Sequence, residues 1–427
     1  MGRREIAVIV VAVTIAAAVY SAVFFYWRPI VLNGRRADVA CFYRAGKMVL
    51  AGEGSQVYDF QEGRRFDDQL RSQIAGTEKK GSLLPFLYTP PSLLLFAPLA
   101  ALQYREAEIT WFVMNAAVLL LLPIWLGREL RLRSDAVFIS ILFPALLIPV
   151  ALALMLGQSS FLILGLLGAV FAALHRGWNA TAGVLLALAT IKPQLIIAFL
   201  MAFVAARNWR LVASFLATGL GLLVASVALV GWRTIIALPG TILAYSHLPL
   251  KVGGEVPETM PGVRGLASVL FRSSVERATF LLLVTGLCLG LVWLANRRGT
   301  NPSAFALTLV VSLMVGYHSY MYDMVLVVLL LPILSSGIAA RGWNWARRTV
   351  ALGLAALVIA PFLPGEVATM AFYFSLIMLA LLVALYNESC REGSLAAHRG
   401  STEDCGGRRF SYGDGSAAHP SLGDARS

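Results

Sequence analysis

EIAVIVVAVTIAAAVYSAVFFYW, residues 5–27, is an apolar run whose single charged side chain, Glu5, stands at its start. A helix of about 23 residues is roughly 34 Å long, enough to cross the ~30 Å hydrocarbon core of a bilayer. Arg3 and Arg4 precede the run, and no small-residue cleavage motif follows it. These features predict a retained transmembrane helix with a cytoplasmic N-terminus, because basic residues stay on that side.

Similar apolar runs recur along the 427-residue chain, which is 58% hydrophobic and only 14% charged. A soluble domain carries about 25% charged residues. The sequence therefore predicts an all-α polytopic membrane protein with roughly 11–13 transmembrane helices. The further predicted spans are 83–101, 108–126, 136–156, 159–174, 180–206, 211–231, 277–295, 303–317, 322–339, 349–363 and 367–386.

Three polar stretches interrupt or follow the domain of residues 1–386. Residues 28–82 are the longest and are predicted to form a first extracytoplasmic loop, and residues 232–276 form a second polar loop rich in proline and glycine. Residues 387–427 lack apolar periodicity and are interpreted as a disordered polar tail.

The net charge of +12 arises largely from basic clusters in short loops, as the positive-inside rule expects, so nucleic-acid binding is not indicated. One cluster conflicts with that rule: if 83–101 and 108–126 both span the membrane, Arg128, Arg131 and Arg133 face outward. Two explanations stay open at this point. Either 83–101 is re-entrant, or this loop is an exception.

Cysteine and acidic residues give no sign of a metal site, a disulfide framework or a bound cofactor. The four cysteines form no C-x-x-C pair, and no D-x-D motif or histidine cluster is present.

Four polar positions stand in or beside the apolar runs, where ionisable groups are costly and mark functional sites by default. They are Asp38, Gln158, Lys192 and the segment from His318 to Asp323. Each also has an ordinary structural interpretation: a helix cap for Asp38 and Asp323, a turn for Gln158, and a lysine that reaches the interface for Lys192. Together they provide an anion, a cation, an imidazole and an amide that can share one cavity.

The order of these motifs resembles glycosyltransferase family 87, and the resemblance covers nearly all of residues 5–386. The resembling stretches are residues 38–46 (DVACFYRAG), 50–52 (LAG), 57–59 (VYD), 88–91 (YTPP), 156–160 (LGQSS), 191–194 (IKPQ) and 322–324 (YDM).

This resemblance implies a GT-C-like helical bundle with its active site on the extracytoplasmic face. It implies a multi-pass protein of the bacterial inner membrane that moves a mannose-like hexose from a polyprenyl-phosphate donor to a lipid or glycan acceptor. An aspartate in the first outer loop, here Asp38, is the implied catalytic base.

The remaining candidate residues are assigned by their chemistry. Transfer to an acceptor hydroxyl needs a base for its proton and positive charge for the leaving lipid phosphate. The candidates for the phosphate are Lys192, His318 and Arg264. The candidates for substrate binding are Gln158, Tyr322, Asp323, Tyr43 and Tyr88. The alternative function is a transporter or flippase for a lipid-linked sugar or another polar solute, since transporters also place polar residues at broken helices.

Overall fold

A computed structural model describes residues 3–32, 38–70, 86–246 and 256–400, and within these ranges the chain is helical with no strand. The N-terminal helix α1 (Arg3–Ser21) continues through a π-helical stretch, Ala22–Trp27, into α2 (Arg28–Leu32). The helices that follow in chain order are α3 (Asp38–Leu50), α4 (Phe60–Leu70), α5 (Leu93–Ala100), α6 (Tyr104–Glu129), α7 (Ser134–Leu142), α8 (Ile148–Leu156), α9 (Ser160–His175), α10 (Asn179–Leu188), α11 (Ile197–Ala205), α12 (Trp209–Val230), α13 (Trp232–Ser246), α14 (Val263–Leu270), α15 (Ser274–Asn296), α16 (Pro302–Val315), α17 (Leu330–Arg341), α18 (Trp345–Ile359) and α19 (Val367–Gly400).

Within the described ranges, seven helices are long and apolar enough to cross a membrane, and the pair α7–α8, bent by 65°, makes eight if it is one span. The predicted all-helical, multi-pass class is therefore confirmed. The larger predicted count included apolar helices of only 10–17 residues, such as α9 and α16. A hydropathy window counts apolar residues but does not detect where a helix stops. The predicted span 180–206 was expected to break at Lys192 and Pro193, as one kinked helix or two short ones, and the structure has two short helices, α10 and α11, on either side of this break.

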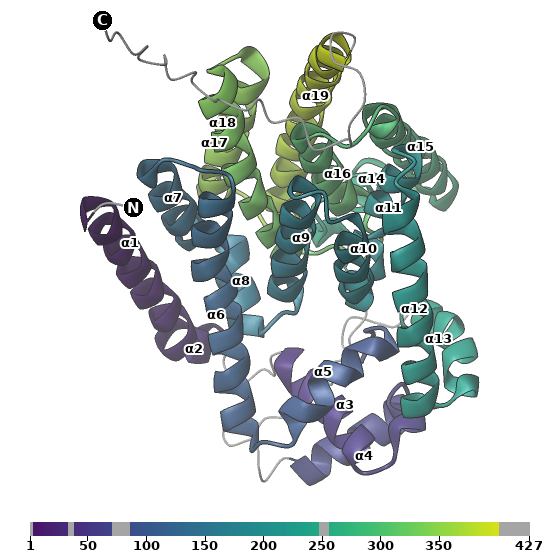
Figure 1. The fold of residues 1–427 in the computed structure, drawn as a ribbon. Coiled ribbons are helices and arrows are strands. Elements are labelled where there is room, and N and C mark those ends of the chain that lie inside the picture. The colour runs from purple at the N-terminus through teal and green to yellow at the C-terminus, as the bar shows by residue number, and fades with distance from the viewer. Residues whose placement is uncertain (1–2, 33–37, 71–85, 247–255, 401–427) are drawn as a thin grey trace, which may run out of the picture.

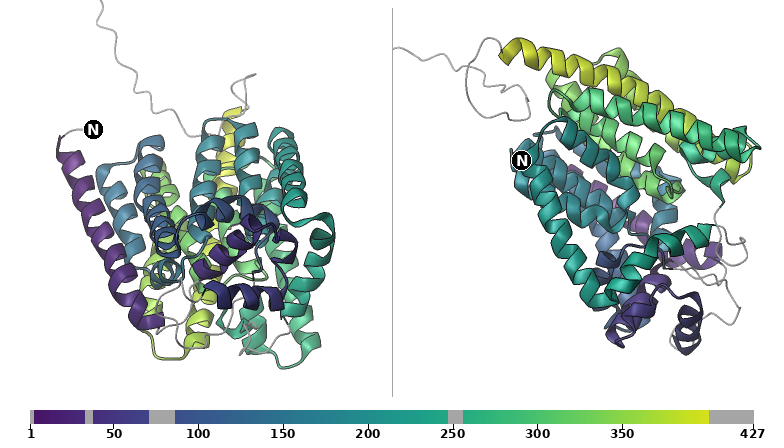
Figure 2. Two further views of the ribbon diagram at one scale, coloured as in Figure 1. Left: turned by 90° about the horizontal axis from the view of Figure 1, so that it is seen from below. Right: turned by 90° about the vertical axis from the view of Figure 1, so that its right-hand side faces the viewer.

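Helices α3, α4 and α5 lie together at one end of the bundle, and the N-terminus of α1 lies at the other (Figure 1). The right-hand panel of Figure 2 shows the same separation from the side. Helix α5 does not cross, because it packs along α3. At Gly46 of α3 a Cβ atom would collide with the carbonyl oxygen of Phe96, so only glycine permits this approach. Helix α6 consequently starts beside α3–α5 and ends at the N-terminal end.

The path of α5 and α6 removes the conflict between the basic residues at 128–133 and the positive-inside rule. Arg128 in the last turn of α6 and Arg131 just after it line the same cavity as Glu5 near the start of α1. Arg176 pairs with Glu129 through its Nε at 2.8 Å, which brings the loop after α9 to this end as well. Since the segment around α5 stays at the opposite end, the cluster at 128–133 lies with the N-terminus. The geometry of the described part, residues 86–101, therefore fits the explanation in which this segment is re-entrant and does not cross the membrane.

Two segments expected to be irregular contain helices. The predicted polar loop 232–276 includes α13 and α14, and the first 14 residues of the predicted tail, 387–400, continue α19; residues 401–427 lie outside the described residues. Part of the first outer loop also folds, into α3 and α4. Only the stretch 387–400 departs from the predicted disordered tail, because some of its polar residues find partners inside the protein.

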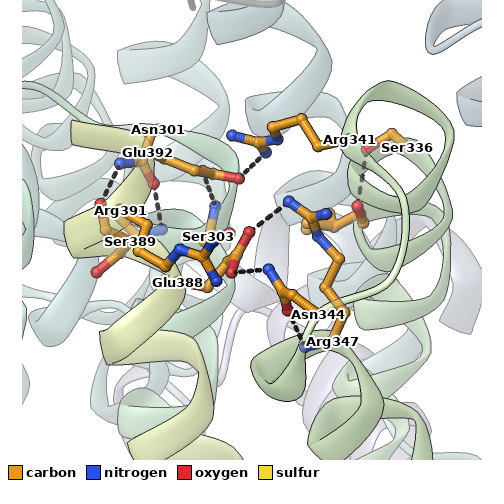
Figure 3. A network of polar contacts seen from close by, with 12 residues as sticks. Asn301, Ser303, Ser336, Arg341, Asn344, Arg347, Glu388, Ser389, Arg391 and Glu392 are labelled. Carbon is orange, nitrogen blue, oxygen red and sulfur yellow. Dashed lines mark hydrogen bonds and ion pairs between the residues drawn. The ribbon is translucent and has the colours of Figure 1, made fainter. Parts of the chain in front are cut away.

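The clearest case is a buried charged cluster at the N-terminal end of the bundle (Figure 3). Glu388 of α19 pairs with Arg347 of α18, and Glu392, one turn further on, pairs with Arg341 at the end of α17. Glu392 also accepts a hydrogen bond from the backbone N–H of Ser303, at 3.2 Å. Glu388 and Arg347 are each only 4% exposed, and charges this buried persist only when paired. The end of α19 thus ties three other helices together.

Candidate functional site

Asp38 is the first residue of α3 and points toward the turn that joins α8 to α9. This turn contains Gly157, which ends α8 with φ of 69°. A Cβ atom at Gly157 would lie 2.9 Å from Cβ of Val39 and 3.4 Å from the ring of Trp111. Both the left-handed conformation and the close approach of α3 therefore require glycine here. The turn places the next residue, Gln158, beside Asp38. The Nε2 group of Gln158 donates a hydrogen bond to Oδ2 of Asp38.

Three neighbours fix the orientation of the Gln158 amide. The hydroxyl of Tyr88 donates to Oε1 of Gln158 at 2.9 Å, and Nζ of Lys192 donates to the same oxygen at 3.3 Å. An amide has one acceptor oxygen and one NH₂ donor group. Because two donors occupy the Oε1 side, the NH₂ group must face Asp38, where it meets a carboxylate that can only accept when ionised.

Lys192 is buried behind Gln158 and has an anionic protein partner. Its Nζ lies 2.6 Å from Oδ1 of Asp323 and 2.9 Å from Oγ of Ser160, and Ser160 also donates to Asp323 at 2.6 Å. The side chains of Lys192 and Asp323 are 5% and 1% exposed. Lys192 lies between two short 3₁₀ segments, Ala189–Ile191 and Pro193–Leu195, so the proline break places the ammonium group inside the bundle.

This pairing changes the interpretation of Lys192. The sequence prediction that it binds the donor phosphate rested on a lone intramembrane cation needing an anionic ligand. In the structure Asp323 already meets that need. Asp323 also accepts a hydrogen bond from the backbone N–H of Tyr320, at 3.1 Å, so its two oxygens are both used.

A row of rings leads from this ion pair toward the end of the bundle. Nζ of Lys192 lies 4.9 Å from the centroid of Tyr322, whose ring is 5.6 Å from that of Tyr320, which in turn is 4.9 Å from His318. His318 is half-buried and lowers the pKa of Asp38 through its charge, so it acts on the same carboxylate.

Arg264 of α14 lies beside this row. Its guanidinium stacks 3.9 Å above the ring of Tyr317 and donates to the Tyr317 carbonyl oxygen at 2.9 Å. Tyr317 directly precedes His318 in the chain. The structure therefore brings Asp38, Gln158, Lys192, Asp323, Tyr88 and Tyr322 into one connected cluster, with His318 and Arg264 at its edge.

Tyr43 is the predicted site residue that the described contacts do not connect to the cluster. Its hydroxyl donates to the carbonyl oxygen of Leu102 at 2.9 Å, and its ring packs edge-on against Tyr104. Both contacts fix α3 against α5 and the start of α6. The prediction that Tyr43 binds substrate gains no support from this position.

Burial dominates the electrostatics of Asp38 and raises the pKa of its carboxyl to about 6. Lys192, the hydrogen bond from Gln158 and the charge of His318 oppose that rise, and Asp323 adds to it. Burial also raises the pKa of Tyr88 well above its usual value, so the Tyr88 hydroxyl stays protonated as a donor. At neutral pH Asp38 is an ionised carboxylate whose affinity for a proton exceeds that of an ordinary aspartate.

Ser160 and Tyr320 also belong to the site, although the sequence marked only the motifs that contain them and not these residues themselves. Ser160 stood in the LGQSS motif, where a hydroxyl two positions after Gln158 was an available signal. Tyr320 contributes its backbone N–H, which no residue-type argument reveals. Among the residues that the structure describes, no group of three or more His, Cys, Asp or Glu side chains is arranged to hold a metal ion.

Comparisons with known proteins identify the family. No curated protein and no solved structure matches the chain. The profile of glycosyltransferase family 87 matches residues 86–319, more than half of the chain. The matched region contains Tyr88, Gln158, Lys192 and His318, and the helical, multi-pass architecture agrees with a membrane enzyme. The chain therefore belongs to glycosyltransferase family 87 and is a membrane glycosyltransferase.

Proposed function

We propose that this enzyme transfers a mannose-like hexose from a polyprenyl-phosphate donor to a lipid or glycan acceptor, with inversion, at the extracytoplasmic face of a bacterial inner membrane. The observation that carries the proposal is the half-buried carboxylate of Asp38, held by the amide of Gln158 at the end of the bundle remote from the basic loops. By the positive-inside rule, that end is the extracytoplasmic one.

In the proposed reaction the acceptor hydroxyl attacks C1 of the donor sugar, and Asp38 accepts its proton. The new bond joins the acceptor oxygen to C1, while the bond from C1 to the phosphate oxygen breaks. The electron pair of that bond leaves with the lipid phosphate. The transition state is oxocarbenium-like, as in other reactions at an anomeric carbon.

Gln158 positions the base in this mechanism. Its NH₂ group occupies Oδ2 of Asp38, which leaves Oδ1 for the acceptor hydroxyl. Lys192 contacts Gln158 on the side of the amide away from Asp38, and it is paired with Asp323. It fixes the Gln158 amide by a hydrogen bond, and its positive charge favours the ionised form of Asp38. These contacts support a positioning role for Lys192 in place of direct phosphate binding.

His318 and Arg264 are the proposed contacts for the leaving phosphate. Both are half-buried, His318 at the end of the aromatic row and Arg264 beside it, so a phosphate can approach them without breaking the Lys192–Asp323 pair. Positive groups placed where negative charge grows lower the barrier of such a transfer. Tyr88 and Tyr322 flank the cluster and are the proposed contacts for the sugar.

The test is a membrane assay with a panel of radiolabelled polyprenyl-phosphate sugars, comparing wild type with Asp38→Asn. Asparagine has nearly the same shape but cannot accept the proton, so turnover should fall by about 10²–10⁴, the usual contribution of a general base. Donor binding should survive, since the charge matters chiefly in the transition state.

Asp59→Asn is the matched control. Asp59 is an aspartate of the same outer loop, and its Oδ1 caps α4 by accepting from the backbone N–H groups of Gln61 and Glu62. Asparagine caps a helix as well as aspartate does, so this variant should stay active. A fully active, stably inserted Asp38→Asn protein would refute the base assignment, and no transfer from any lipid-phosphate sugar would refute the donor class.

A further inference from the structure

A cavity at the N-terminal end of the bundle has no part in the proposed reaction. It lies between α1, the end of α6 and the start of α7, and holds about 600 Å³ including its open mouth. Its polar lining consists of Glu5, Arg128, Arg131 and Ser134. This end is opposite to the end that carries α3 and Asp38 (Figure 1), so the cavity cannot serve the sugar-transfer site.

The two arginines of the cavity are available for a ligand. Neighbouring arginines are already paired, Arg176 with Glu129 and Arg133 with Asp135. Among the described residues, neither the Arg128 nor the Arg131 side chain makes a hydrogen bond or an ion pair. Both residues line the cavity and both are exposed, so two arginines border it without a protein anion bound to either.

The chain holds Arg131 in this position with an unusual backbone. Its φ is 52°, in the left-handed region that favours glycine, and the turn that ends α6 closes through the N–H of Leu132 donating to Gly127 at 2.8 Å. The turn places Arg131 two residues beyond the end of α6, where it lines the same cavity as Arg128.

The opposite part of the lining is apolar. Ile9, Ile124 and Val137 form it, and α1 continues outward with Ile6 and Val10, which are 49% and 56% exposed. A lining that combines two arginines with apolar side chains matches an amphiphile, with its phosphate at the arginines and its chains along α1. Basic pockets between transmembrane helices on the cytoplasmic side bind phospholipid headgroups in this way.

We propose that this cavity binds the headgroup of an anionic glycerophospholipid from the leaflet at the N-terminal end, with its phosphodiester on Arg128 and Arg131. Glu5 and Ser134 accept hydrogen bonds from headgroup hydroxyls, so a glycerol headgroup fits the lining better than a bare anion. The acyl chains follow the exposed face of α1.

The experiment is a native mass spectrometry titration of the full-length protein, released from detergent, with short-chain phosphatidylglycerol. Phosphatidylcholine of the same chain length and inorganic phosphate are the comparison ligands. Wild type should bind one phosphatidylglycerol in preference to both. The variant Arg128→Gln/Arg131→Gln should bind it about 30-fold more weakly, since each basic residue near a membrane surface contributes a factor of about five.

Two further variants keep the result interpretable. Arg131→Gly suits the left-handed turn and removes only the guanidinium, so it should fold normally and lose about fivefold in affinity. Arg133→Gln removes a charge from the same loop that is paired outside the cavity, and it should bind like wild type. Equal binding of phosphatidylcholine, equal competition by inorganic phosphate, unchanged affinity in the double variant, or an equal loss in Arg133→Gln would each overturn the proposal.

Discussion

The burial of Asp38 makes a quantitative prediction about pH. If Asp38 is the base, only its ionised form is active, and its pKa is raised to about 6. Activity should therefore be lost as the pH falls through 6. With that pKa about 90% of Asp38 is ionised at pH 7 and about 10% at pH 5, so kcat/KM should fall roughly tenfold between them, with an acid limb near 6. An ordinary aspartate would put this limb near 4.

Gln158→Leu gives the perturbation that tests the cause. The hydrogen bond from Gln158 lowers the pKa of Asp38, so its loss should move the acid limb to higher pH as well as reduce the rate. Initial rates of transfer from the best lipid-phosphate sugar, measured from pH 4.5 to 8, provide the profile. An acid limb that stays in place in Gln158→Leu, while Asp38→Asn is inactive, would refute the positioning role and leave the base assignment intact.

The same pKa predicts a stability effect with a definite sign. Since the folded state raises the pKa of Asp38 from 3.8 to about 6, it binds its proton more tightly than the unfolded chain does. The wild type should lose stability as pH rises through that window, by an amount on the order of 3 kcal/mol. Asp38→Asn should consequently be at least as stable as wild type at pH 7 in a thermal unfolding assay in detergent. A destabilised Asn variant would contradict this reasoning.

Further predictions concern the turn, the charged cluster and the topology. Gly157→Ala should lose about 1–2 kcal/mol of stability from its left-handed backbone, with a loss of transfer activity because α3 is pushed away, and full activity would contradict the packing argument. Arg347→Met should lower stability by about 3–5 kcal/mol by leaving Glu388 buried and unpaired, and Arg347→Met/Glu388→Gln should recover part of it; additive losses in thermal unfolding would argue against the pair. A cysteine at exposed Ala51 should react with an impermeant reagent in intact cells, and one at Asp135 should react only after lysis; the reverse pattern would invert the proposed orientation.

The sequence alone determined the class of the molecule. Apolar runs separated by basic loops require helices in a bilayer, because every backbone N–H and C=O group must be paired within its own segment. The order of short polar motifs also predicted the family that residues 86–319 match. Both conclusions depend on local sequence patterns, which can be recognised without knowing how the helices pack.

The site itself was partly visible in the sequence. Lys192 and Asp323 stand in or beside apolar runs, and the cost of burying such charges marked both as candidates. What the sequence could not show was that they neutralise each other, since 131 residues separate them in the chain. The same limit explains Glu388 and Glu392, which stand in the segment interpreted as a disordered tail because it lacks apolar periodicity, whereas packing places arginines beside them.

Only the tertiary structure decided which apolar segments cross the bundle and how the proposed base, Asp38, is oriented. Helix α5 is as apolar as a membrane span, and only its close packing on α3 at Gly46 shows that it stays at one end. The orientation of the Gln158 amide likewise depends on donors from two distant segments, at Tyr88 and Lys192. Hydropathy is a property of each segment, whereas topology and hydrogen-bond direction depend on which segments meet, and that is determined only when the chain folds.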